Sequence, residues 1–361
     1  MKAIIACGGT GGHLFPGLAV AEQLSARGHE ILLFVSEKEI DAQALRSHPE
    51  FRAEKLPTIG MPSLLSPAVV GFARRLIESL SRCGEIYKRD KPGVVLGMGG
   101  FTSIAPLLAG RLRGIPTFVH ESNVIPGRAN KLAARFVTQV LLGFDACRAN
   151  LPGVNAAVTG TPIRSTLLGP VSREDALERF KLRPDRRTLL VMGGSQGAAG
   201  VNQLMFKAAP LLKAGNVQII HITGERDEKL AAANYLREEI PAYVAPFHHQ
   251  MQDAYAAADL VISRAGAASI SELTHFGLPS VLIPFPYATD NHQEANARIL
   301  EVAGAALVVR ENDANAEIFA RIVEGLLADD GRRRAISDAA RSLAPENSAG
   351  QIADILEAAV R

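Results

Sequence analysis

The segment KAIIACGGTGGHLFPG, residues 2–17, joins a short apolar run directly to a loop with four glycines, which is followed by a histidine. The apolar run has the length of a buried strand, and glycines after a strand let main-chain N–H groups approach a ligand closely. A helix that begins behind such a loop points the positive end of its dipole at the same place. The segment therefore predicts a strand, a phosphate-binding loop and a helix, with His13 at the helix start.

The same order of features returns in RTLLVMGGSQGA, residues 187–198, and apolar runs alternate with helix-length segments along most of the chain. This alternation is typical of βαβ units, so we expect an α/β protein with two Rossmann-like, doubly wound domains. The expected domains are residues 1–163 and 164–340, and a C-terminal helix, 341–361, closes the second sheet or crosses back to the first domain. The first helix is expected at about 16–27. Expected strands are 2–7, 30–35, 93–98, 116–120, 137–142, 187–192, 217–222, 259–263 and 280–283.

Composition limits the class of protein. The chain has 361 residues, 47% of them hydrophobic, which is enough for two domains with their own cores, and it has no apolar run of membrane-spanning length. Three widely spaced cysteines form no CxxC pair, so neither a disulfide framework nor a zinc site is expected, and a reducing cytoplasm fits. Residues 1–6 are too short for a signal peptide, so export is not expected.

Three glycine loops follow predicted strands, the third being GMGG at 97–100. A single loop of this kind is as often a tight turn as a phosphate site, but three of them favour a phosphate ligand. The P-loop motif GxxxxGK[ST] is absent, and the dinucleotide spacing GxGxxG fails because Leu14 follows His13. A dinucleotide oxidoreductase, with Glu37 as its ribose-binding acid, is therefore a weak alternative.

His13 is the candidate general base. We expect the positive end of the helix to lower its pKa and keep the imidazole neutral. The alternative is a structural histidine that caps the turn or hydrogen-bonds in the wall between the domains.

In the second half, SRAGAASISE at 263–272 is again a strand end, a small-residue loop and a helix start. Uncovered N–H groups of residues 267–271 suit a phosphate, and Glu272 suits the two hydroxyls of a ribose; alternatively, Glu272 only stabilises the helix dipole. The polar run 290–296 suits sugar hydroxyls, although a polar helix start looks the same.

Seven motifs together closely resemble, in order and spacing, the MurG family of bacterial glycosyltransferases of peptidoglycan synthesis: GGTGGHLFPG, GMGGF, HESNVIPGRAN, TGTPIR, GGSQGA, SRAGAASISE and DNHQEANA. The resemblance spans nearly the whole chain. It implies a GT-B fold, in which two Rossmann-like domains face each other across a cleft and the C-terminal one holds the sugar nucleotide. It also implies transfer of N-acetylglucosamine from UDP-N-acetylglucosamine to the muramoyl 4-hydroxyl of lipid I, giving lipid II with inversion at the anomeric carbon.

The resemblance also implies roles for individual residues. His13 would be the general base, Thr10, Gly11 and Gly12 would lie against donor and acceptor phosphates, and Asn123 and Asn130 would bind the N-acetylglucosamine and the acceptor side. The other implied donor contacts are Arg164 and Ser195 for the diphosphate, the backbone of His248 for uracil, Ala267, Ala268, Ser269, Ile270, Ser271 and Glu272 for diphosphate and ribose, and Gln293 for the sugar. The chain contains no Asp-x-Asp pair, so we expect no metal and no cofactor, with helix dipoles and Arg164 stabilising the leaving diphosphate.

Four features depart from the common family pattern, namely Ser122, Phe101, Thr161 and the stretch 59–66. The last of these touches the presumed acceptor side. The expectations for donor binding are therefore better supported than those for lipid I recognition.

Charge and hydropathy point to a membrane surface. Residues 1–164 carry a net charge of +7 and the remainder −5, and residues 61–91 combine apolar side chains (Met61, Leu64, Leu65, Val69, Val70, Phe72) with basic ones (Arg74, Arg75, Arg82, Lys88, Arg89, Lys91). We expect peripheral contact with an anionic membrane, at the cytoplasmic face of the inner membrane, and no nucleic-acid partner. A core helix is the alternative for 61–91.

Two other functions remain open. A UDP-N-acetylglucosamine 2-epimerase uses the same nucleotide sugar and two similar domains but needs no lipid acceptor. A non-catalytic nucleotide-sugar-binding subunit has no use for the predicted base at His13.

Overall fold

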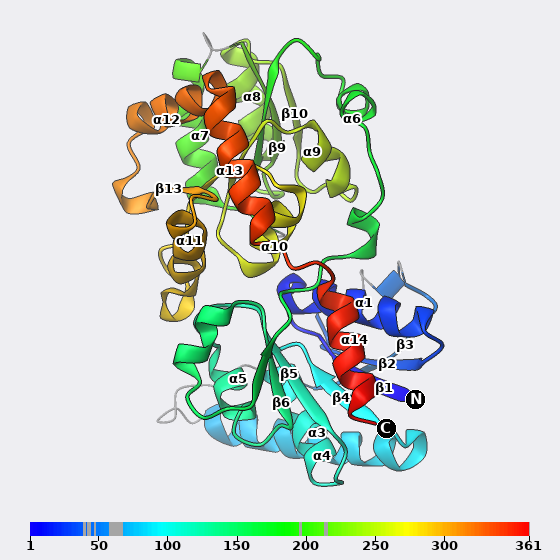
Figure 1. Ribbon diagram of the computed structural model, residues 1–361. Coiled ribbons are helices and arrows are strands. Elements are labelled where there is room, and N and C mark those ends of the chain that lie inside the picture. Colours follow the sequence, from blue (N-terminus) through cyan, green and yellow to red (C-terminus); the bar gives the residue numbers. More distant parts are fainter. Residues whose placement is uncertain are drawn as a thin grey trace. The chain divides into compact units, whose positions relative to one another are not determined.

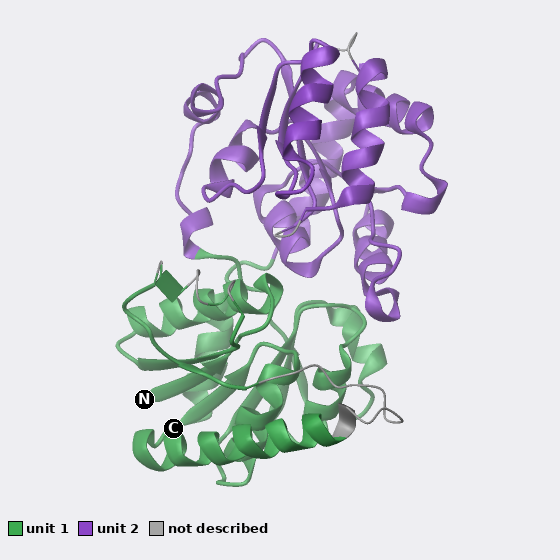
Figure 2. Cartoon of the chain, turned by 180° about the vertical axis from the view of Figure 1, so that it is seen from behind, with its two compact units in different colours: residues 1–164, 345–361 green, residues 165–344 purple. Residues whose placement is uncertain are grey.

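The computed structural model describes residues 1–38, 41, 45–46, 48–57, 68–194, 197–212 and 216–360 (Figure 1). The chain divides into two compact units (Figure 2). The first unit comprises residues 1–164 and 345–361, and the second comprises residues 165–344. Arg164, expected to open the second domain, belongs to the first unit.

The first unit is built on a seven-stranded parallel sheet with the strand order β3-β2-β1-β4-β5-β6-β7. Its central strands are buried on both faces, as parallel strands covered by helices are. The strands are β1 (Lys2–Ala6), β2 (Glu30–Val35), β3 (Arg52–Lys55), β4 (Val94–Gly97), β5 (Thr117–Glu121), β6 (Gln139–Leu142) and β7 (Ala156–Val158).

Alternate residues of these strands serve two cores. Ile4, Leu32 and Phe34 belong to the core under α3 (Ala68–Asp90), α4 (Ile104–Arg111) and α5 (Arg128–Ala133). Ala3, Ile5 and their neighbours belong to the core under α1 (Gly11–Ala26) and α14 (Ser348–Ala358). The C-terminal helix α14 therefore packs in the first unit, where it lies on α1 (Figure 1) and its Asp354 pairs with Arg27 at 2.6 Å.

The second unit repeats the plan with six parallel strands in the order β10-β9-β8-β11-β12-β13. These strands are β8 (Arg187–Met192), β9 (Val217–Ile222), β10 (Ala242–Ala245), β11 (Leu260–Ser263), β12 (Ser280–Leu282) and β13 (Leu307–Val308). The helices are α6 (Arg173–Arg179), α7 (Ala199–Leu212), α8 (Glu228–Arg237), α9 (Met251–Ala257), α10 (Ala267–Phe276), α11 (His292–Val302), α12 (Ala316–Ala328) and α13 (Asp330–Ser342).

The prediction of two doubly wound sheets is confirmed, and each predicted strand is present to within one or two residues at either end. Four short strands, β3, β7, β10 and β13, were not predicted, because they have only two to four residues and β3 is also mostly charged. The prediction for the start of the first helix was wrong. The helix begins at Gly11 instead of about residue 16, so two glycines with low helix propensity and His13 lie in its first turn.

Within the described residues, none of the helices combines the length and the apolar character needed to cross a bilayer.

Close packing of α1 on β1 generates a stability prediction. An added methyl on Gly17 would lie 2.4 Å from Cβ of Cys7 and 3.1 Å from Cγ of Met98, both buried. Gly17→Ala is therefore expected to lower the free energy of unfolding by about 1–3 kcal/mol through overpacking. The matched control is Gly71→Ala in α3, where nothing lies within 4 Å of the added methyl and a gain of roughly 0.5–1 kcal/mol is expected. Urea unfolding measures both, and equal effects of the two changes would contradict this packing.

Candidate functional site

The strand order of each sheet reverses direction at its first strand, between β1 and β4 in the first unit and between β8 and β11 in the second. In open parallel sheets, ligands bind outside the carboxyl ends of strands at this switch point. All three predicted glycine loops, and the small-residue loop at 264–266, follow these four strands. The topology thus places the predicted phosphate loops where such a fold binds ligands.

In the first unit, the loops after β1 and β4 meet around His13. An added Cβ on Gly99 would lie 3.0 Å from Nε2 of His13, and one on Gly100 would lie 3.2 Å from Cε1. Both glycines have positive φ, at 109° and 70°, a conformation that side chains disfavour. Thr10 Oγ1 lies 3.3 Å from Nδ1 of the same ring. The imidazole is therefore held between two glycine loops with no side chain in between.

Burial lowers the pKa of His13 to about 4, which favours the neutral imidazole at pH 7; Asp41 opposes this shift and Lys38 adds to it. The helix dipole was expected to be the cause, but burial is the main one. A neutral imidazole carries a lone pair that accepts a proton, as a general base requires.

Asp41, to which the sequence analysis gave no role, holds the first glycine loop. Its buried carboxylate accepts hydrogen bonds from the main-chain N–H of Gly9 at 2.9 Å and of Ser36 at 2.8 Å. The main-chain N–H of Gly9 is thus already hydrogen-bonded within the protein. The amides of Gly11 and Gly12 lie at the start of α1, where Thr10 and Gly12 are exposed and Gly11 is buried.

Glu121, at the end of β5, organises the motif HESNVIPGRAN. Its buried carboxylate accepts hydrogen bonds from the N–H of Asn123 at 2.8 Å, the N–H of Gly127 at 2.9 Å and Nδ2 of Asn130 at 2.8 Å. The sequence identified this motif and its two asparagines, but no role was predicted for Glu121. An acid at a strand end, followed within ten residues by two asparagines and a glycine, is the signal that was available.

The side chain of Asn130 packs against Gly99, as the ring of His13 does. It is 4% exposed, and its Nδ2 lies 3.1 Å from where a Cβ on Gly99 would be. Among the described residues, its buried Oδ1 has no hydrogen-bond partner. The predicted pair of Asn130 and His13 is therefore brought together, and Asn130 presents a buried acceptor that a ligand donor would satisfy.

Arg164 also belongs to this unit, and its guanidinium lies 4.4 Å above the ring of Phe15 in α1. A cation stacked on an aromatic face is fixed in orientation. This places the guanidinium against the second turn of α1.

In the second unit, α10 begins at Ala267 directly after the loop that follows β11. Arg264 braces this loop, because its buried guanidinium donates to the carbonyls of Ile283 and Pro284 at 3.1 and 3.2 Å and pairs with Glu311 at 2.5 Å. Ile270 N–H already donates to Gly266 C=O at 2.9 Å. We expected main-chain N–H groups free for a ligand from Ala267 through Ser271. Only those of residues 267–269 precede Ile270, whose N–H makes the first hydrogen bond within the helix.

Glu272 is positioned by Tyr255 of α9, whose buried hydroxyl donates a hydrogen bond to its carboxylate. Tyr255 was not predicted, because nothing in the local sequence connects α9 to α10. The side chains of Ile270 and Ser271 are buried.

The remaining donor-side candidates are His248, Gln293 and Ser195. The His248 ring turns inward, 5.1 Å from the Phe180 ring, with Nδ1 3.4 Å from the Tyr243 hydroxyl, and burial lowers its pKa. Gln293, on α11, accepts a hydrogen bond from Phe285 N–H at 3.0 Å. Ser195 lies outside the described residues, as does the stretch 59–66.

Two family models match the chain: the glycosyltransferase family 28 N-terminal domain over residues 3–142 and the glycosyltransferase family 28 C-terminal domain over residues 188–352. A protein of Geobacter sulfurreducens, named as a UDP-N-acetylglucosamine–N-acetylmuramyl-(pentapeptide) pyrophosphoryl-undecaprenol N-acetylglucosamine transferase, is 37% identical over 365 residues. That alignment covers 100% of this chain and 99% of the relative.

Solved structures agree on the fold. The crystal structure of Acinetobacter baumannii MurG aligns with a TM-score of 0.78 and 26% identity, covering 99% of each chain. A putative UDP-N-acetylglucosamine 2-epimerase of Listeria monocytogenes aligns with a TM-score of 0.69 and 14% identity, covering 99% of this chain and 95% of its own. The GT-B fold is therefore confirmed, but the fold alone does not separate a transferase from an epimerase.

The environment of His13 predicts its titration. In NMR spectra of the ligand-free protein, the His13 imidazole is expected to stay neutral down to about pH 5 and to protonate near pH 4, because burial disfavours the cation. The missing signal in a His13→Gln sample assigns the resonance. Titration near pH 6.5, the value of a solvated histidine, would contradict this environment.

Proposed function

Because the chain belongs to glycosyltransferase family 28, we propose that it transfers N-acetylglucosamine from UDP-N-acetylglucosamine to the muramoyl 4-hydroxyl of lipid I, forming lipid II. The observation that carries this proposal is the neutral His13, held at the switch point of the first sheet between two glycine loops. The full-length similarity to transferases of this name supports the choice of donor and acceptor.

The second unit would hold the donor. The amides of residues 267–269, at the positive end of α10, suit the diphosphate, and Glu272 suits the ribose hydroxyls. Because the His248 ring turns inward, the main chain of His248 would contact the uracil. The side chain of Gln293 would contact the sugar. Ser195 and Arg164 remain proposals for the diphosphate on the strength of the resemblance.

The first unit would supply the acceptor side and the base. Thr10, Gly11 and Gly12 would lie against phosphate at the start of α1, and Asn123 and Asn130 would bind sugar and acceptor groups. In the reaction, the acceptor oxygen forms a bond to the anomeric carbon while the bond from that carbon to the phosphate oxygen breaks. UDP leaves with the electron pair, and the hydroxyl proton passes to the His13 imidazole.

We propose that helix α3 carries the protein to the acceptor. Its side chains Val70 and Ile77 are 75% and 66% exposed, two helical turns apart, with the exposed Arg74 and Arg75 between them. Val70, Arg74 and Ile77 stand at positions i, i+4 and i+7 and so share one helix face, and apolar and basic side chains on one face suit the surface of an anionic bilayer. The expected site would be the cytoplasmic face of the inner membrane.

Some side chains of the expected membrane segment make contacts within the first unit. Phe72 is half-buried and packs edge-on against Phe101, with ring centroids 5.7 Å apart. Arg82 and Arg89 both pair with Glu54, at 3.3 and 3.2 Å. Met61, Leu64 and Leu65 lie outside the described residues.

The test of the function is release of UDP from UDP-N-acetylglucosamine with and without a lipid I analogue. Release is expected only with the acceptor, and His13→Ala is expected to lower turnover by on the order of 10² to 10⁴ while donor affinity stays nearly unchanged. Acceptor-independent conversion of UDP-N-acetylglucosamine into its 2-epimer would instead indicate the epimerase, and donor binding without either reaction would indicate a binding subunit. Turnover of His13→Ala within a few-fold of wild type would show that His13 is structural.

Donor binding is tested by Glu272→Ala. Loss of charge-assisted bonds to the ribose is expected to weaken UDP-N-acetylglucosamine binding by about 1–3 kcal/mol, measured by calorimetry. The matched control is Glu178→Ala, an exposed glutamate on α6 of the same unit, which should leave the affinity as it is. Unchanged affinity in Glu272→Ala would remove Glu272 from the site.

Membrane docking is tested by two double variants of α3. Arg74→Gln with Arg75→Gln is expected to weaken binding to anionic vesicles by roughly 1 kcal/mol per arginine. Arg82→Gln with Arg89→Gln removes the same charge from arginines that already pair with Glu54, so a smaller loss is expected. Equal losses, or vesicle sedimentation that salt does not change, would contradict docking through this face.

A further inference from the structure

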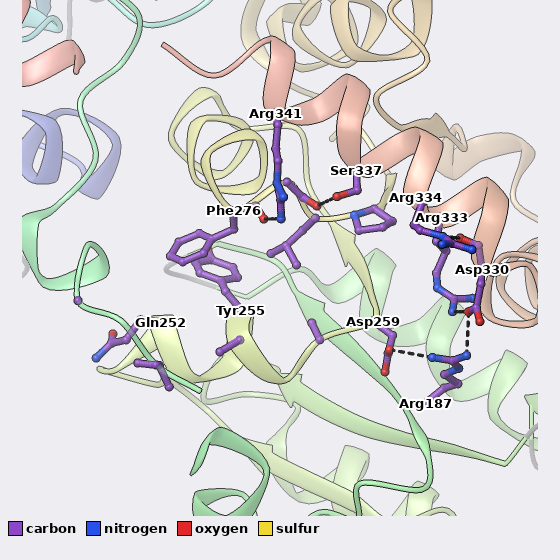
Figure 3. A pocket seen from close by; sticks show the side chains of 17 residues that line it. Arg187, Gln252, Tyr255, Asp259, Phe276, Asp330, Arg333, Arg334, Ser337 and Arg341 are labelled. Atoms are coloured by element: carbon purple, nitrogen blue, oxygen red, sulfur yellow. Dashed lines mark hydrogen bonds and ion pairs between the residues drawn. The ribbon is translucent and has the colours of Figure 1, made fainter. Parts of the chain in front are cut away.

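The second unit contains a cleft of about 660 Å³ between α9, the C-terminal end of α10 and helix α13 (Figure 3). This volume lies within the range of small-molecule sites. The cleft borders Phe276 and Gly277, at the C-terminal end of the helix whose first turn is the proposed donor site. A ten-residue helix is about 15 Å long, so the cleft is separate from the proposed diphosphate site at residues 267–269, whereas Glu272 lies about one turn before Phe276.

The charges that line the cleft are mainly positive, with four arginines and two aspartates. Both aspartates are neutralised, since Arg187 pairs with Asp259 at 3.3 Å and with Asp330 at 2.8 Å, and Arg333 also pairs with Asp330. Arg333 is buried and donates to the carbonyls of Leu326 and Leu327. These charged groups form a connected network at one end of the cleft (Figure 3), which Arg173 joins by pairing with Asp259 at 2.7 Å.

The other two cations, Arg334 and Arg341, are not neutralised. Both are exposed, and among the described residues neither has a carboxylate within ion-pair distance. Arg341 is held in place, because its NH2 donates to the Phe276 carbonyl at 3.1 Å and its side chain occupies the space beside Gly277, where a Cβ would lie 2.2 Å from Nε. Arg334 Nε donates to the main-chain carbonyl of Asp330 at 3.3 Å.

The two arginines are seven positions apart on α13, so their Cα atoms lie on one face of the helix, about 10 Å apart along its axis. Apolar surface lies beside them. The rings of Tyr255 and Phe276 stand 5.0 Å apart at the cleft, and Leu278 and Pro279 continue this wall. A ligand that fills the cleft would thus meet two guanidinium groups without a carboxylate partner among the described residues, and the half-buried ring of Phe276.

We propose that this cleft is a second binding site, for a small phosphorylated ligand with several negative charges. Guanidinium groups bind phosphoryl oxygens with charge-assisted hydrogen bonds, and two guanidinium groups at separate positions suit a polyphosphate chain or two separate anionic groups better than a single phosphate. The site goes beyond the proposed transfer reaction, since none of its arginines takes part in that reaction.

The cleft also touches the donor side. Tyr255 lines it and donates the hydrogen bond that positions Glu272. A ligand in the cleft therefore contacts a residue that holds the proposed ribose-binding carboxylate.

The test is calorimetric titration of the full chain with ATP and, separately, with inorganic tripolyphosphate, each in the presence of saturating UDP so that the donor site is filled. Both probes are expected to bind the wild-type protein. Equal affinity of the two would show that the phosphates suffice, and tighter binding of ATP would show that the aromatic wall contributes. Failure of both probes to bind would overturn the proposal.

The decisive comparison is between two double variants. Arg334→Ala with Arg341→Ala is expected to weaken probe binding roughly tenfold or more. Arg321→Ala with Arg332→Ala removes two exposed arginines, from α12 and α13, that do not line the cleft, and should leave it unchanged. Equal effects of the two pairs would overturn the proposal. Arg334→Ala alone repeats the test without disturbing the contact of Arg341 with α10, and UDP titration of each variant tests the donor site separately.

Discussion

Packing of one imidazole against two glycines is the constraint on which the first unit depends. The space for the His13 ring exists because Gly99 and Gly100 have no side chains and adopt positive φ, and a Cβ on either would lie within about 3 Å of the ring. This packing buries the ring enough to keep it neutral. The size of the ring also sets the distance between the loops after β1 and β4. Helix α1, which carries the ring, lies close to the sheet, where its Gly17 packs against Cys7.

Buried charges then fix the loops around this contact. Asp41 holds the Gly9 amide, Glu121 holds both asparagines of its motif, and in the second unit Arg264 ties the loop before α10 to the segment after β12. Each charge is satisfied by several hydrogen bonds, so removing one partner would leave a costly buried group. The two sheets share one strand order, yet they present different chemistry at the switch point: a proton acceptor in the first unit and a helix N-terminus in the second.

Much of this was predictable from the sequence, for physical reasons. Long apolar runs identify buried parallel strands because both faces must be covered, and the glycine spacing identifies the switch-point loops. The edge strand Arg52–Lys55 was not predictable, because its pairing with β2 and not its own polarity makes it a strand. Tyr255 was missed because its role depends on a contact between two helices. The cause of the His13 pKa was misjudged because burial depends on the loop after β4, more than eighty residues away along the chain.

In the proposed reaction, a base-activated hydroxyl attacks the anomeric carbon opposite the leaving UDP in a single displacement. The most direct test is the stereochemistry of the product formed from α-linked UDP-N-acetylglucosamine and a lipid I analogue, read from the coupling constant of the anomeric proton in the NMR spectrum. A β-linked disaccharide is expected. An α-linked product would require two displacements or a different route and would contradict the role of His13 as the general base.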